Sequence, residues 1–163
     1  MTADPLETAW KLQAALADWT GKADTKASIA LSIQSTVLAL VGALATSGSG
    51  AKVQSIPGQV LLWTGGCILL CGALLAVVAI APNLGLERRG PGPEDDYLFF
   101  GHLRHFKPEV LEAALKSDST LSALSRQIVV MSQIAWIKHR RVQFSFIFAV
   151  IGCASLGASA ALG

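Results

Sequence analysis

Long uninterrupted runs of apolar residues dominate the pattern of this chain. Three of them, at residues 27–46, 60–81 and 142–161, contain no charged side chain, and Gln34 is the only large polar residue in the first. The hydrocarbon core of a bilayer requires about 20 mostly apolar residues in helical conformation. The pattern therefore predicts three transmembrane helices, the first two forming a hairpin (27–81) around a Ser- and Gly-rich loop at 47–59.

Small residues recur along one face of the first predicted span at spacings of three and four. Small residues on a helix face allow close helix packing. In a multi-copy assembly, the same weakly polar face could instead line a narrow water path. Both interpretations stay open for the predicted seam, which consists of Ser28, Ser32, Ser35, Ala39, Gly42 and Thr46, with Ala149, Cys153 and Gly157 on the third span. We expect the seams of spans one and three to meet.

An amphipathic helix is predicted ahead of the first span, within residues 1–26. Asp4 and Pro5 form a helix-start signal, and apolar residues including Trp10 and Trp19 cover about half of the circumference. The tryptophans could rest at the lipid headgroups or pack on the segment after the second span. A bend is possible at residues 20–22.

The segment 82–141 is predicted to be a small helical layer. Its Pro- and Gly-rich start at 88–93 excludes regular helix, a short helix should begin at Pro108, and residues 120–160 should form one continuous helix that becomes the third span. Residues 121, 124, 128, 131 and 135 follow a heptad-like spacing.

Composition and charge agree with a membrane protein. The chain has 163 residues, of which 52% are hydrophobic and 15% charged, and its mean hydropathy is +0.52. Of 13 Lys and Arg residues, nine lie between the second and third spans and none follows the third. By the positive-inside rule, the N-terminus and residues 82–141 are cytoplasmic. We thus predict an all-α integral membrane protein.

No catalytic or metal-binding motif is present. The sequence lacks a phosphate-binding glycine loop, a His-Glu-x-x-His motif and a Gly-x-Ser-x-Gly elbow. We therefore expect that the protein is not an enzyme, that it binds no cofactor and that it has no nucleic-acid partner. The Asp24 carboxylate at the membrane boundary should form an ion pair with the basic cluster at 138–141, with Arg140 as its partner. The basic residues could also bind a phosphate-bearing ligand, or they could only set topology and contact anionic lipids. The candidate ligand residues are Arg104, Arg126, Arg140, His102 and Lys26.

Three motifs resemble one known family. They are the step Asp24-x-Lys26-Ala-Ser, the segment Tyr97-Leu-Phe-Phe-Gly-His-Leu, and the spacing of Gln127, Ile128, Ile134 and Lys138 within the last long helix. Together they resemble the transmembrane effectors of Pycsar anti-phage defence, over nearly the whole chain. Two-span defence effectors linked to other nucleotide messengers have a similar layout.

The resemblance implies an abortive-infection effector. In such a system a partner cyclase makes a cyclic pyrimidine mononucleotide, cCMP or cUMP. The effector, as a homo-oligomer in the lipid bilayer, crosses the bacterial inner membrane several times and impairs it. No cyclic-nucleotide-binding β-roll is recognisable here, so either the helical layer or another chain would sense the nucleotide. A rival prediction is a non-toxic membrane scaffold that recruits a cytoplasmic partner.

Overall fold

The computed structural model describes residues 4–46, 55–81, 103, 106–116 and 120–162. These residues form the α-helices α1 (Pro5–Thr46), α2 (Ile56–Ile80), α4 (Pro108–Lys116) and α5 (Thr120–Leu162), and no strand occurs among them. Three of these helices, α1, α2 and α5, are long and apolar enough to cross a membrane. The predicted all-α class with three spans is confirmed.

Helix α1 begins as predicted but continues where a bend was possible. The Leu6 N–H donates to the Asp4 side chain at 3.1 Å, which caps the helix start. At the expected bend, the Thr20 hydroxyl donates to the Leu16 carbonyl at 2.8 Å and the helix runs on through Gly21. A glycine inside a helix costs only about 1 kcal/mol relative to alanine, and the neighbouring helical residues outweigh it. The predicted division at residue 26 is therefore not a break in the helix.

Helix α2 starts earlier than predicted. Ser55 is its N-cap and accepts a hydrogen bond from the Gly58 N–H at 3.2 Å, and Pro57 lies in the first turn. Proline is tolerated there because the N–H groups of a first turn have no helical partner. The other two helices match their predicted bounds, including the start of α4 at Pro108 and the unbroken course of α5 from Thr120.

The described residues divide into two compact units. We name them the head unit (the described residues within 1–21 and 82–136) and the bundle unit (those within 22–81 and 137–163). In the head unit, Ala9 and Leu16 of α1 and Leu124 of α5 are buried. Trp10 and Trp19 remain about half exposed, at 45% and 52%. Of the residues with heptad-like spacing, Leu124 and Ala135 are buried and Leu121 is exposed.

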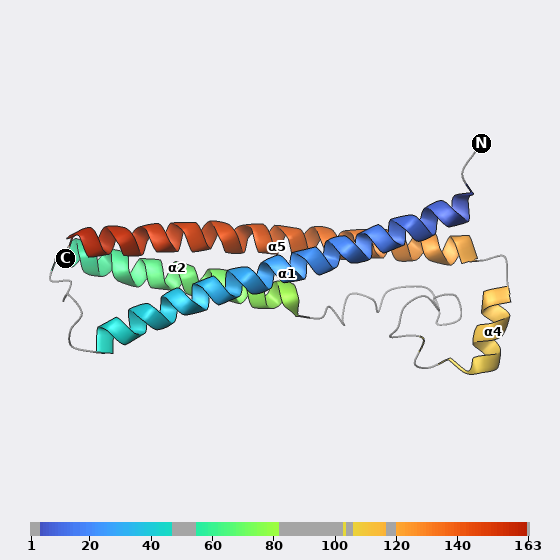
Figure 1. The fold of residues 1–163 in the computed structure, drawn as a ribbon, viewed down its shortest axis with the longest axis horizontal. Helices are drawn as coiled ribbons and strands as arrows, with labels where there is room; N and C mark the ends of the chain where they lie inside the picture. Colours follow the sequence, from blue (N-terminus) through green and yellow to red (C-terminus); the bar gives the residue numbers. More distant parts are fainter. Residues whose placement is uncertain (1–3, 47–54, 82–102, 104–105, 117–119, 163) are drawn as a thin grey trace. The chain divides into compact units, whose positions relative to one another are not determined.

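In the bundle unit, α1, α2 and α5 lie side by side (Figure 1). Contacts between α2 and α5 pair early residues of one helix with late residues of the other, so these two are antiparallel, while α1 and α5 run in the same direction. Small side chains make the core, namely Ala23, Ala27, Ala79 and Val142. Large apolar side chains such as Ile33, Leu70 and Val150 point outward, as expected for a bundle whose surroundings are hydrocarbon.

Candidate functional site: polar contacts inside the helix bundle

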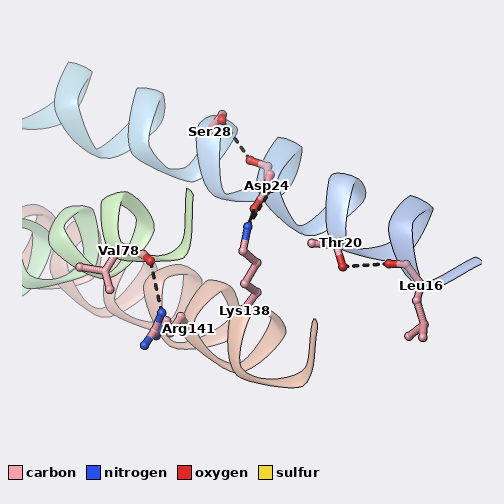
Figure 2. A network of polar contacts seen from close by, with 7 residues as sticks. All are labelled: Leu16, Thr20, Asp24, Ser28, Val78, Lys138 and Arg141. Carbon is pink, nitrogen blue, oxygen red and sulfur yellow. Dashed lines mark hydrogen bonds and ion pairs between the residues drawn. The ribbon is translucent and has the colours of Figure 1, made fainter. Parts of the chain in front are cut away.

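An ion pair joins α1 to α5 at one end of the bundle unit. The Lys138 ammonium donates to both carboxylate oxygens of Asp24, at 2.7 and 2.9 Å (Figure 2). The Lys138 side chain is only 8% exposed, whereas that of Asp24 is 36% exposed. A buried charge requires a partner with good geometry, and a carboxylate bound through both oxygens supplies it.

The partner of Asp24 is Lys138 and not Arg140, which corrects the sequence prediction. Lys138 lies four and seven residues before Val142 and Ser145, so all three share the buried face of α5. Arg140 is two positions further along the helix, on a different face, and is exposed. Its guanidinium instead lies 5.9 Å from the centroid of the Phe144 ring.

Arg141 interacts with the C-terminal end of α2. Its guanidinium donates to the Val78 carbonyl at 3.3 Å (Figure 2). The last four carbonyls of a helix lack helical partners, and the Ala81 N–H satisfies the Val77 carbonyl. A cation at this end also complements the helix dipole. The basic cluster thus contributes to the packing of the bundle.

A second polar contact lies deep in the bundle and involves all three helices. The Gln34 amide Nε2 donates to the Ser145 carbonyl at 2.9 Å and to the Ser145 hydroxyl at 3.1 Å. That hydroxyl donates in turn to the Gly72 carbonyl at 2.8 Å. Gln34 and Ser145 are both 0% exposed. We name Gln34, Ser145 and Gly72 the central polar layer.

Two serines make further contacts at the other end of the bundle. The Ser159 hydroxyl, which is buried, donates to the Gly58 carbonyl at 2.7 Å. The Ser55 hydroxyl donates to the Leu162 carbonyl at 2.8 Å. Polar contacts therefore join α2 and α5 along most of the length of α2.

The predicted small-residue seams do not face each other within the chain. Every seam residue of α1 is exposed, and an added Cβ at Gly42 or Gly157 would meet nothing within 4 Å. The buried face of α1 is instead formed by Ala23, Ala27, Ala30 and Gln34. Several seam hydroxyls donate to their own helix, for example Ser32 to the Ser28 carbonyl at 3.0 Å. Within one chain, spans one and three therefore pack through other faces.

The candidate ligand residues are only partly described. Lys26 and Arg140 are exposed in the bundle unit, and Arg126 is exposed in the head unit. His102 and Arg104 lie outside the described residues, as do Tyr97 and the Phe-Phe-Gly segment. Among the described residues, no group of three or more His, Cys, Asp or Glu side chains could hold a metal ion.

Sequence reasoning missed the central polar layer and the role of Ser159. Gln34 stood out as the large polar residue of its span, but Ser145 and Ser159 carry no special signal among other small residues. Their importance depends on which face of α5 meets α2. The glycines on the same face allow α2 and α5 to approach closely, since a Cβ on Gly152 would lie only 2.6 Å from Leu69 Cγ.

Comparison with known proteins identifies the family. The family model PycTM, described as the Pycsar effector protein domain, matches residues 8–163, which include the Asp24–Lys138 ion pair and the central polar layer. No curated protein and no solved structure matches the chain. The matched region spans the three long helices and covers well over half of the sequence. The chain therefore belongs to the Pycsar effector family, the membrane effectors of a cyclic-nucleotide-signalled anti-phage defence.

Proposed function

We propose that this protein impairs the bacterial inner membrane when its defence system is activated. A partner cyclase would make a cyclic pyrimidine mononucleotide, cCMP or cUMP, during phage infection, and the bundle unit would then rearrange so that ions leak. In this proposal the N-terminus and the head unit are cytoplasmic, in accordance with the excess of basic residues before the third span.

The observation that carries the proposal is the ion-paired Lys138 within a bundle whose exterior is apolar. Its side chain is 8% exposed and is held by both oxygens of Asp24. Ionisable residues within membrane spans are costly and commonly mark ion pathways or switches, and the buried Lys138 lies four residues before the third predicted span. A bundle that only anchored the protein in the membrane would not need this buried charge. Apolar residues of similar volume would give the bundle equal or greater stability.

Within a single chain, the described helices of the bundle unit pack closely in this conformation. Leu69, Ala76, Gln34 and Ser145 are all 0% exposed, and alanines fill the space between the helices. A leak therefore requires that the helices separate or that several chains combine. This supports a transition between a sealed and an open state as the means of control.

The outward seams suit contacts between copies of this chain. The seam of α1 is uncovered, and so are Cys153 and Gly157 of α5. In a bilayer, close approach of helix backbones drives association. Our proposal is a homo-oligomer in which these seams meet across chains, either as sealed packing or as the wall of a water path.

Activation requires a ligand that prefers one of the two states. Any ligand shifts such an equilibrium only by its difference in affinity. The candidate contacts to its phosphate are Arg104, Arg126, Arg140, His102 and Lys26. An arginine guanidinium can bind phosphate through two hydrogen bonds, and a lysine ammonium binds it as a point charge. The alternative is that a second protein senses the nucleotide and contacts the head unit.

The test is membrane potential and dye entry in bacteria that express the protein with an active pyrimidine cyclase. The control strain carries a catalytically inactive cyclase. We expect depolarisation only with the active cyclase, followed by dye entry. If the protein is inserted in the membrane and the potential is unchanged in both strains, the protein does not impair the membrane and the scaffold prediction is favoured.

A further inference from the structure

We propose that Gln34 favours the activated state of the bundle. In the sealed bundle its side-chain amide lacks a hydrogen bond, and in a bundle whose interior is filled with water it would gain one from water. This inference rests on the proposed function, since it names the residue through which the sealed bundle becomes hydrated. It concerns a residue of the buried face, and not the outward seams.

The hydrogen bonding of the Gln34 amide is one-sided. Its Nε2 donates to Ser145, at 2.9 Å to the carbonyl and 3.1 Å to the hydroxyl. Its Oε1 is buried and has no hydrogen-bond donor among the described residues. The side chain is 0% exposed. A buried amide oxygen without a donor is costly, and the cost is higher in hydrocarbon surroundings, where no water reaches it.

The sealed bundle does not need this amide to satisfy its other polar groups. The Ser145 hydroxyl donates to the Gly72 carbonyl at 2.8 Å, and neither atom of this hydrogen bond belongs to Gln34. The Ser145 carbonyl belongs to the helix α5, in which backbone carbonyls accept from N–H groups four residues later. An apolar side chain of similar length at position 34 would therefore leave no new unpaired group and would remove the unpaired Oε1.

The amide must then be favourable in another state. If α1 moves away from α5 and water enters, Oε1 accepts hydrogen bonds from water while Nε2 keeps a partner. The change removes a penalty that exists only in the sealed state, so Gln34 shifts the equilibrium toward opening. A methionine at this position gains no hydrogen bond from water, so it shifts the equilibrium toward the sealed state.

A substitution at Gly72 tests the same contact independently. A Cβ at Gly72 would lie 3.0 Å from Gln34 Oε1, 3.1 Å from Gln34 Nε2 and 3.0 Å from Phe148 Cβ. The substitution Gly72→Ala therefore requires the Gln34 amide and Phe148 of α5 to shift by a few tenths of an ångström. Gly66 on the same helix is its matched control, since a Cβ there meets nothing within 4 Å.

The experiment compares Gln34→Met, Gly72→Ala and Gly66→Ala in the full chain, with and without the active pyrimidine cyclase. We expect the rate of cyclase-dependent depolarisation to fall about tenfold or more in Gln34→Met, the factor that corresponds to one unsatisfied buried acceptor. Gly72→Ala should leak without the cyclase, and adding Gln34→Ala, which makes room for the new methyl group, should reduce that leak. Gly66→Ala should behave like the unchanged chain.

Water entry is measured separately by thiol labelling. Ala30 is 1% exposed and lies one turn before Gln34 on the same face. We place Ala30→Cys in a chain whose Cys67, Cys71 and Cys153 are replaced by alanine, because maleimides react with thiols only where water allows them to ionise. Labelling should increase severalfold on activation, and this increase should be lost with Gln34→Met.

The outcomes separate this inference from the proposed function. If the unchanged chain does not depolarise the membrane with the cyclase, the proposed function fails. If it does and Gln34→Met depolarises equally, or leaks without the cyclase, the inference is overturned, because the amide then has no effect or holds the bundle closed. Equal insertion of all variants in the membrane is verified by protease protection.

Discussion

Lys138 of α5 donates to both carboxylate oxygens of Asp24 of α1, 114 positions apart in the chain. The two residues have unequal exposure, since Lys138 is nearly buried and Asp24 is about one-third exposed. The lysine therefore depends on the carboxylate more than the carboxylate depends on the lysine. This asymmetry determines what happens when either member is removed.

Removing Asp24 should destabilise the bundle more than removing a nearby exposed charge. In Asp24→Asn the Lys138 ammonium stays buried and loses its counter-charge. Breaking a buried pair costs roughly 3–5 kcal/mol, and the partial exposure of Asp24 lowers our expectation to about 1–3 kcal/mol. The measurement is thermal or denaturant unfolding of the detergent-solubilised protein.

Lys26→Met is the matched control, because Lys26 is an exposed cation two residues from Asp24. It should leave the midpoint of unfolding within experimental error. The double change Asp24→Leu with Lys138→Met should recover most of the loss, since both charges leave together. Equal losses for Asp24→Asn and Lys26→Met would contradict the importance of the pair.

Serines that connect two helices should matter more than serines bonded within one helix. The Ser159 hydroxyl donates across to the Gly58 carbonyl at 2.7 Å, whereas the Ser32 hydroxyl donates to its own helix at 3.0 Å. We expect Ser159→Ala to lower the free energy of unfolding by about 0.5–1 kcal/mol. Ser32→Ala should have almost no effect in the same assay, and a reversed order would disprove the assignment.

The fold was largely predictable because its signals are local. Apolar run lengths located the three spans, and Pro108 and Thr120 marked the starts of α4 and α5. The start of α2 was placed too late because Ile56 and Pro57 look like loop residues until Ser55 is recognised as an N-cap. The uninterrupted α1 was also missed, since Gly21 marks a weak point in a helix and does not require a break.

The site was harder to predict because it depends on helix rotation. Asp24 was expected to pair with a basic residue at 138–141, but choosing Lys138 over Arg140 requires knowing which face of α5 meets α1. Predicting whether the seams of α1 and α5 meet likewise requires knowing how each helix is rotated about its axis. Small residues occur on more than one face of each span, and the faces that pack within the chain contain Ala27, Ala30 and Gly152.

Glycines at the contact between α2 and α5 should be intolerant of added volume. A Cβ on Gly152 would lie 2.6 Å from Leu69 Cγ and 3.1 Å from the Gly65 carbonyl oxygen. The helices must move apart to admit it, so we expect Gly152→Ala to cost about 1–3 kcal/mol of stability. The loss is measured as a lower unfolding temperature in detergent.

Gly157→Ala provides the comparison on the same helix. A Cβ there meets nothing within 4 Å, so the unfolding temperature should stay unchanged or rise slightly, because alanine favours helix over glycine. If both substitutions lowered the unfolding temperature equally, the packing of α2 on α5 described here would be incorrect.

Bulky residues in the outward seams should affect activity without affecting the folded chain. Gly42 and Gly157 are open within one chain, so Gly42→Leu and Gly157→Leu should leave insertion and the unfolding temperature intact. If copies of the chain approach each other through these seams, the added side chains keep the backbones apart, and cyclase-dependent depolarisation should be lost. Gly66→Leu, also open but on α2, is the control that should retain activity. Depolarisation that persists in both seam variants would show that the seams face only lipid, and the assembly would then have to use another surface.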